Sequence, residues 1–309
     1  MKVEMYPHAV RADDNPFITI LADGLKEAGV QAVQYMPFRR GYLSDALHVH
    51  WLEQVAWGRF AKRLRGVMVV LARCLVRRAR EYRAAGRPVV WTVHNLAPHE
   101  SLKGEASQAF AELRRLFLPL VTDVIFMSGS IVDEVVAQYP EISGAVRHVI
   151  PLPHFRRFFA DIQRPGVEID PGAYRKAPVL AVIGMLRPYK GIPQLISVAR
   201  ELDEDFLMIV AGHGDPGICG AIEEAIGSDR RFVLDKRRLT HSDVVSALSG
   251  ADLAVFNFQS ILNSASVLTA LSLDTPVLCP SSASLSEIAQ LVGSDWVSCF
   301  DPPLRSEHI

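Results

Sequence analysis

Short apolar runs alternate along this chain with longer segments whose apolar positions recur every three or four residues. The short runs predict buried β-strands, and the longer segments predict helices. In the first half, strands are expected at residues 1–7, 30–38, 46–51, 89–94, 123–128 and 146–153. In the second half, they are expected at residues 179–184, 206–211, 232–235, 253–258, 276–279 and 296–300. Strands and helices that alternate in this way predict parallel sheets covered by helices on both faces.

One stretch interrupts the alternation and divides the chain. Residues 151–178 contain five prolines and two glycines, a composition typical of a junction between domains. We therefore expect a first domain at 1–155, a linker at 156–177 and a second domain at 178–309. The 309 residues suffice for two doubly wound domains of about 150 residues each. Few residues follow the last strand, so the final helix of the second domain is expected to be short or missing.

Composition limits the classes of partner. A formal net charge of −1 argues against nucleic acid as an electrostatic partner. The four cysteines are scattered without the spacing of a metal site, which predicts reduced, buried thiols in a cytosolic protein. The N-terminus lacks the apolar segment of a signal peptide, and no apolar run approaches the length of a transmembrane helix.

Residues 59–83 form a strongly basic segment with nine Arg or Lys residues and one acidic residue, Glu81. Apolar residues recur among them at helical spacing. Such a helix suits an anionic membrane surface, which would place the protein on the inner face of the cell membrane. The alternative is a helix that covers the sheet with its apolar stripe while its arginines reach solvent.

The residues of segment 184–191 predict an anion-binding site. It follows the strand at 179–183 and presents Gly184, Arg187 and Lys190 before a helix begins. A strand, a tight turn and a helix N-terminus can hold a phosphate group with backbone N–H groups and cations. A second helix start, at Asn263 and Ser264, has similar character, and two such sites suggest a diphosphate.

Two further loops at the same predicted sheet edge are candidates for binding a nucleoside. Gly212 and His213 follow the next strand, where a glycine would let a nucleotide approach the backbone. Lys236 and Arg237 follow the strand at 232–235 and are candidate contacts of the base and ribose. No metal site is expected, because the acidic triplet at 203–205 precedes its strand and therefore lies at the opposite edge.

Two doubly wound domains with a phosphate loop in the second resemble the GT-B glycosyltransferases, whose Rossmann-like domains face each other across a cleft. The run 184–191 is similar to their G-x-x-R-x-x-K-G loop. More narrowly, the chain resembles the β-mannosyltransferases of xanthan-type exopolysaccharide assembly. The matching stretches are LHVHWLE (47–53), TVHNLAPHE (92–100), LRPYKG (186–191) and ALSLDTPVLCP (270–280), the last led by Asn263 and Ser264. The resemblance implies inverting transfer of mannose from GDP-mannose to a lipid-linked oligosaccharide at the cytoplasmic membrane face.

The chain departs from the larger retaining GT-B group. The paired glutamates of that group would fall near Ile261 and Thr269, and neither position is acidic. A retaining mechanism is therefore in doubt. With no metal site expected, Arg187, Lys190 and the helix start at 263–264 would stabilise the charge that grows on the leaving diphosphate.

In a GT-B enzyme the catalytic base lies at the strand ends of the N-terminal domain. A carboxylate partly buried there suits a general base, which favours Glu53 or Glu100, with Asp13 or Asp14 next. We expect His94 to contact the sugar or the phosphate. The acceptor is expected to meet Asn15, His50 and Trp51, whose indole offers an apolar face for a sugar ring.

Two other functions stay open at this stage. The chain could be a scaffold subunit of a polysaccharide assembly complex that binds nucleotide sugar without turning it over. It could also be a GT-B epimerase, which shares the fold and isomerises a free nucleotide sugar. The products distinguish the three, because only a transferase moves sugar to an acceptor.

Overall fold

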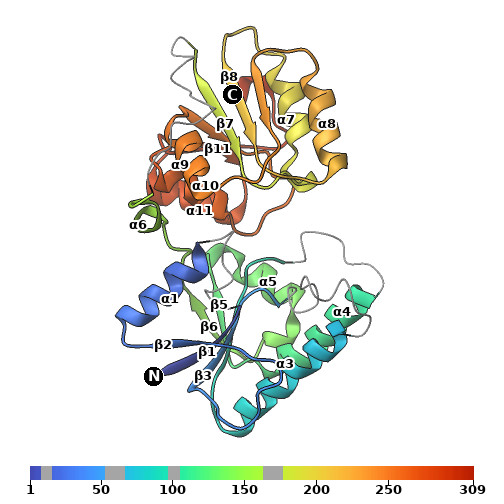
Figure 1. The fold of residues 1–309 in the computed structure, drawn as a ribbon, viewed down its shortest axis with the longest axis vertical. Helices are drawn as coiled ribbons and strands as arrows, with labels where there is room; N and C mark the ends of the chain where they lie inside the picture. Colours follow the sequence, from blue (N-terminus) through green and yellow to red (C-terminus); the bar gives the residue numbers. More distant parts are fainter. Residues whose placement is uncertain (8–15, 53–66, 97–104, 163–176) are drawn as a thin grey trace. The chain divides into compact units, whose positions relative to one another are not determined.

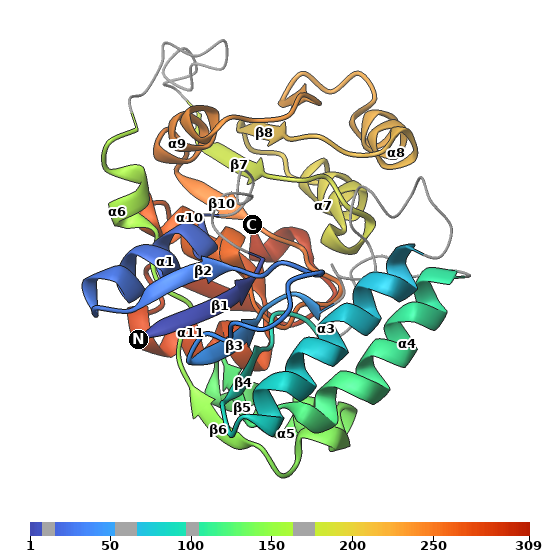
Figure 2. The same ribbon diagram turned by 60° about the horizontal axis from the view of Figure 1, so that its bottom comes forward.

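The computed structural model describes residues 1–7, 16–52, 67–96, 105–162 and 177–309. These residues form two compact units, Met1–Pro153 and His154–Ile309. Each unit is built on one parallel six-stranded sheet covered by helices (Figures 1 and 2). The predicted α/β fold class is thereby confirmed.

The sheet of the N-terminal unit has the order β2-β1-β3-β4-β5-β6. Its strands are β1 (Lys2–Tyr6), β2 (Gln31–Gln34), β3 (Ala46–Val49), β4 (Val89–Thr92), β5 (Asp123–Phe126) and β6 (Val146–Val149). All pairings are parallel. Each of the six strands expected in this half overlaps an observed one, and the observed strands are shorter, mainly at their carboxyl ends.

Helices cover this sheet on opposite faces. They are α1 (Phe17–Glu27), α3 (Val67–Ala84), α4 (Glu105–Phe117) and α5 (Val132–Gln138), with 3-10 turns at Leu118–Leu120, Gly129–Ile131 and Pro140–Ile142. Val3 and Met5 pack toward Leu21 and Leu25 of α1. The residue between them, Glu4, points to the other face, because side chains alternate along a strand. There it meets α3, which lies beside α4 (Figures 1 and 2).

Helix α3 packs against the sheet. Its apolar stripe is buried at Leu75, Val76, Ala79 and Tyr82. The membrane interpretation counted Arg78 among the surface cations of this helix, and that is wrong, because Arg78 is 1 % exposed and is bound to Glu4. The described part of α3 therefore covers the sheet with its apolar stripe, and contact of its exposed arginines with a membrane stays a prediction. Residues 59–66 lie outside the described residues.

The sheet of the C-terminal unit has the order β12-β11-β10-β7-β8-β9, again with parallel pairings. The strands are β7 (Val179–Ile183), β8 (Leu207–Ala211), β9 (Phe232–Asp235), β10 (Leu253–Val255), β11 (Val277–Pro280) and β12 (Val297–Phe300). Each overlaps a predicted strand. Where the chain was expected to lack a full final helix, it forms a 3-10 turn at Ser306–His308.

Successive side chains of β7 and β8 point to opposite faces of the sheet, and each face has its own apolar core. Helices α7 (Ile192–Ala199) and α8 (Pro216–Ile226) share a core with Val182 and Val210. The other face carries α9 (His241–Ser249), α10 (Ala265–Ser272) and α11 (Ala283–Val292), packed on Ala181 and Ile209. Strands buried on both faces explain the unbroken apolar runs in the sequence.

The start of the predicted linker belongs to the second unit. Helix α6 (Arg156–Phe159) follows Phe155, whose backbone N–H donates to the Ser272 hydroxyl at 2.8 Å. Arg156 forms an ion pair with Asp274, and the Phe158 ring lies edge-on to His241 at 4.9 Å. Residues 154–159 are thus held on the C-terminal unit, and the rest of the linker from 163 to 176 lies outside the described residues.

Two further expectations concern thiols and membranes. Cys74, Cys219 and Cys279 are buried and unbridged as expected, but Cys299 is exposed. Cys299 lies on the edge strand β12, whose middle residues Ser298 and Cys299 are exposed while Val297 and Phe300 are buried. In the described part of the chain, no helix combines the length and the apolar character needed to cross a membrane.

Candidate functional site

The predicted phosphate loop begins where β7 ends. Gly184 has a φ of 111°, a conformation that favours glycine, and its N–H donates to the Ala211 carbonyl at 3.0 Å. A Cβ on Gly212 would lie 1.9 Å from the Gly184 carbonyl oxygen. The loops after β7 and β8 therefore touch backbone to backbone, and the two glycines permit this contact.

The contact between the loops after β7 and β8 continues along both loops, beyond the two glycines. The Leu186 N–H donates to the His213 carbonyl at 2.8 Å, and Leu186 forms an isolated parallel bridge with Gly214. A Cβ on Gly214 would meet Leu186 atoms at 2.9 Å. The structure thus brings the predicted Gly212 and His213 directly beside the predicted phosphate loop.

Lys190 ends the 3-10 turn Pro188–Lys190 and is the most informative side chain of this loop. It is 7 % exposed, and its Nζ lies 3.3 Å from where a Cβ of Gly184 would stand. Burial, and secondly the nearby Arg187, lower the pKa of Lys190 to about 8. Lys190 forms no ion pair with any described residue. A buried ammonium group without a counter-ion is costly, and an anionic ligand would relieve that cost.

The second predicted anion site follows β10, the neighbour of β7 on its other side. Ser264 is the N-cap of α10, with its hydroxyl accepting from the Val267 N–H at 3.2 Å. The hydroxyl can still donate its proton to a ligand, and the first N–H groups of a helix are donors of the kind that bind anions. The loop after β10 is tied to the phosphate loop, because the Asn257 amide donates to the Gly191 carbonyl at 3.0 Å. Asn263 directly precedes the cap.

The predicted nucleoside contacts, Lys236 and Arg237, follow β9, and both side chains bind carboxylates of their own unit. Lys236 pairs with Glu223. Arg237 binds Asp235 at 2.8 Å and both carboxylate oxygens of Asp243 at 2.8 Å. The hydrogen bonds from Arg237, and after them those from the Thr240 backbone and hydroxyl, lower the pKa of Asp243 to about 2. Arg237 therefore fastens the end of β9 to the start of α9, and its orientation is fixed.

In the N-terminal unit, aromatic and imidazole rings gather at the carboxyl ends of β3 and β4. His50 Nδ1 and His94 Nε2 share a hydrogen bond of 3.2 Å. The Trp51 indole stacks on the His94 ring at 4.0 Å, and the Phe17 ring stands edge-on to His94 at 5.1 Å. His48 lies beside His50 at 4.2 Å. The structure thus brings together the predicted His50, Trp51 and His94.

The three imidazoles are neutral near pH 7. Burial lowers the pKa of His48 to about 4 and that of His94 to about 3, and it holds the pKa of His50 well below 6.5. His48 is satisfied by the Thr92 hydroxyl at 2.7 Å. His50 Nε2 is buried and has no hydrogen-bond partner among the described residues. This cluster offers neutral hydrogen-bonding nitrogens and an apolar ring face, the groups that bind a sugar.

Sequence reasoning missed His48 and Phe17 as members of this cluster. The signal for His48 was the spacing of His48 and His50, two apart on one strand and therefore on one face. Phe17, the first residue of α1, gave no local signal. Other predicted residues, namely Glu53, Glu100, Asn15, Asp13 and Asp14, lie outside the described residues.

No grouping of three or more His, Cys, Asp or Glu residues that could hold a metal ion occurs among the described residues. The triplet Asp203, Glu204 and Asp205 precedes β8, at the amino edge of the sheet. The phosphate loop follows the carboxyl end of β7, which is the opposite edge.

Comparison with known proteins defines the family. The chain is 30 % identical over 299 residues to the GDP-mannose:glycolipid 4-beta-D-mannosyltransferase of Xanthomonas campestris pv. campestris, covering 94 % of this chain and 76 % of the relative. This chain belongs to that family. The resemblance indicated by the sequence motifs is confirmed. A search of protein-family models found no match.

Solved structures agree on the fold of this family member. Sucrose-phosphate synthase from Thermosynechococcus elongatus aligns over 98 % of this chain and 86 % of its own, with a TM-score of 0.65 and 15 % identity. HepE from Anabaena, solved with UDP and glucose, aligns over 100 % of this chain and 87 % of its own, with a TM-score of 0.64 and 14 % identity. At these identities the likeness concerns the fold, and it confirms the predicted GT-B architecture.

Proposed function

We propose that this protein transfers mannose from GDP-mannose to a lipid-linked glycan in the synthesis of an exopolysaccharide or another cell-surface glycan. Membership in the mannosyltransferase family, whose name states this donor and acceptor, supports the proposal. The observation that carries it is Lys190, a buried cation with no described counter-ion beside the glycine-lined loop. A diphosphate supplies the negative charge that this site lacks.

On this proposal the donor binds along the carboxyl edge of the C-terminal sheet. Its diphosphate lies at Gly184, Arg187 and Lys190 and meets the start of α10 at Asn263 and Ser264. These groups stabilise the charge that develops as the sugar leaves, without a divalent metal. The nucleoside extends toward Gly212 and His213, with Lys236 and Arg237 further along the same edge.

The acceptor side of the proposal uses the N-terminal unit. His50 and His94, neutral at physiological pH, exchange hydrogen bonds with sugar hydroxyls, and Trp51 gives a ring face to the sugar. Asn15, two positions before Phe17 in the sequence, is a further proposed contact of the acceptor. Glu53 is the proposed general base and Glu100 the alternative. The missing glutamates at Ile261 and Thr269 support an inverting reaction, in which this base takes the acceptor proton.

We also propose that the protein works on the inner surface of the cell membrane, where its lipid-linked acceptor would be located. The exposed arginines of residues 59–83, such as Arg73 and Arg80, would face anionic lipid there.

Product analysis tests the proposed activity. Purified protein is incubated with a panel of radiolabelled nucleotide sugars and a membrane lipid extract, with and without a metal chelator. The expected result is transfer of label from GDP-mannose to the lipid fraction in both conditions. An isomerised free nucleotide sugar would establish an epimerase instead, and binding without turnover would establish a scaffold. Glu53→Gln or Glu100→Gln should lower turnover roughly 10²–10⁴-fold if that residue is the base.

A further inference from the structure

The connection between β2 and β3 exposes large apolar side chains at close spacing. Met36 is 50 % exposed, Phe38 is 72 % exposed and Tyr42 is 54 % exposed, all within seven residues. Single exposed apolar residues are ordinary on protein surfaces, but a cluster indicates a contact surface. We name residues 36–42 the aromatic–basic loop.

Cations lie among these apolar side chains. Arg39 and Arg40 are both exposed and form no ion pair with a described carboxylate. The Arg39 guanidinium lies over the Tyr42 ring at 5.4 Å, and the Lys2 ammonium lies at 5.8 Å from the same ring. The carboxylate of Asp45, just beyond the loop, accepts a hydrogen bond from the Lys2 backbone N–H at 2.7 Å. The loop therefore presents positive charge together with apolar surface.

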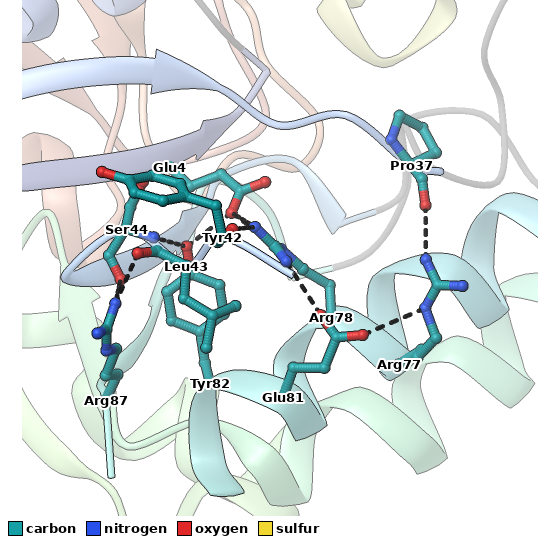
Figure 3. A network of polar contacts seen from close by, with 10 residues as sticks. All are labelled: Glu4, Pro37, Tyr42, Leu43, Ser44, Arg77, Arg78, Glu81, Tyr82 and Arg87. Carbon is teal, nitrogen blue, oxygen red and sulfur yellow. Dashed lines mark hydrogen bonds and ion pairs between the residues drawn. The ribbon is translucent and has the colours of Figure 1, made fainter. Parts of the chain in front are cut away.

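The backbone of the loop is fastened to α3 and to the turn after it. Arg77 donates to the Pro37 carbonyl at 3.1 Å, and Arg78 donates to the Tyr42 carbonyl at 2.7 Å (Figure 3). Arg87 donates to the carbonyls that follow, Leu43 at 2.6 Å and Ser44 at 2.7 Å.

These bonds hold the main chain at both ends of the aromatic–basic loop and leave its apolar side chains outward. A loop fixed in its exposed form does not need to be ordered when it binds a partner, which lowers the cost of association. The exposure of Phe38 is therefore built into the fold.

We propose that the aromatic–basic loop is a membrane-contact surface. Phe38, Met36 and Tyr42 enter the boundary between headgroups and acyl chains, and Arg39 and Arg40 meet the phosphates of anionic lipids. Aromatic rings and arginines are the side chains that favour this boundary. Arg39 and Arg40, which have no carboxylate partner among the described residues, give the charge complementarity that selects an anionic lipid surface. The loop contacts α3 of the 59–83 segment, and the inference rests on the membrane location proposed above, not on the identity of the donor.

Vesicle co-sedimentation of the full chain tests the proposal. The wild type should bind vesicles of equal phosphatidylglycerol and phosphatidylcholine, and binding should fall with added salt. Phe38→Ser should lower the partition coefficient at least tenfold, and the double change Arg39→Ser and Arg40→Ser should do the same. Leu291→Ser, at a side chain 76 % exposed on the other unit, is the matched control and should bind as wild type.

Three outcomes would overturn the membrane assignment. The wild type could fail to bind these vesicles, or the loop variants could bind as tightly as wild type. Analytical ultracentrifugation could instead show a dimer that the same variants dissociate, which would make the loop a protein interface. Thermal melting of each variant confirms that the fold is intact. GDP affinity, measured without vesicles, reports separately on the proposed donor site.

Discussion

The Arg78 guanidinium donates two hydrogen bonds to a single oxygen of Glu4, at 2.8 and 3.0 Å, and so joins α3 to β1 inside the N-terminal unit (Figure 3). The Tyr82 hydroxyl donates to the same oxygen at 2.6 Å. Both charged side chains are almost fully buried, at 2 % exposure. A buried pair of this kind is costly to break, because the Glu4 carboxylate without Arg78 is a buried charge with no counter-ion.

Arg78→Met should therefore lower the free energy of unfolding by about 3–5 kcal/mol, because it leaves the buried Glu4 carboxylate without a counter-ion. Arg80→Met, on the exposed side of the same helix, should change it by less than about 0.5 kcal/mol. Urea denaturation measures both. Equal stability of the two variants would show that the Glu4–Arg78 pair does not support this unit.

Gly212→Ala should destabilise the protein by more than about 2 kcal/mol, because the new Cβ would overlap the Gly184 carbonyl oxygen at 1.9 Å. The matched control is Gly220→Ala in α8, where the added Cβ would have no atom within 4 Å apart from its chain neighbours and the backbone of its own helix. That change should stabilise the protein by about 0.5–1 kcal/mol through helix propensity. Thermal unfolding compares them, and a tolerated Gly212→Ala would contradict the close contact of the two loops.

Lys190→Met should weaken GDP binding roughly tenfold or more, because it removes a charged contact to the diphosphate. The same change should raise the melting temperature of the free protein, since a buried unpaired charge is lost. Calorimetry measures the expected loss of GDP affinity, and thermal melting measures the expected rise in melting temperature. Lys26→Met, at an exposed lysine of α1, should leave both unchanged. A Lys190→Met variant with full GDP affinity would remove Lys190 from the donor site.

GDP affinity should fall as the pH rises through about 8. The pKa of Lys190 is lowered from 10.5 to about 8, so the side chain is cationic below that pH and neutral above it. The unfolded chain keeps this proton up to about pH 10.5, so the stability of the free protein should rise between these two values. Calorimetry from pH 6.5 to 9.5 follows the affinity, and Lys190→Met should abolish this dependence. An equally pH-dependent variant would assign the titration to another group.

Trp51→Ala should raise the KM for the glycolipid acceptor severalfold while GDP affinity stays unchanged, because the indole stacks on His94 in the unit proposed to hold the acceptor. Trp51→Phe should restore part of the loss, since it keeps an aromatic face. Steady-state kinetics with varied acceptor measures the effect. An unchanged KM in the alanine variant would place the acceptor elsewhere.

The sequence by itself determined the strands, the two-unit division and the loops that carry the glycines and cations. These features are local: a strand between helices is read from a run of apolar residues, and a phosphate loop from residues within one turn. Because β7, β8 and β10 are parallel, their carboxyl ends lie at one edge of the sheet, and the sequence could therefore group the loops that follow them. Gly184 and Gly212 do meet there, and the shared phosphate site with Ser264 stays a prediction.

The tertiary structure decided what each side chain faces. Arg78 belongs by sequence to a basic surface segment, yet Glu4, 74 positions away, draws it into the interior. Phe38 lies at the end of the strand predicted at 30–38, yet Arg77 and Arg78 bind the Pro37 and Tyr42 carbonyls on either side of it, and its ring is exposed. His48 and Phe17 join His50 and His94 only because β3, β4 and α1 meet. Burial and charge pairing depend on partners distant in the chain, and a periodic pattern carries no information about them.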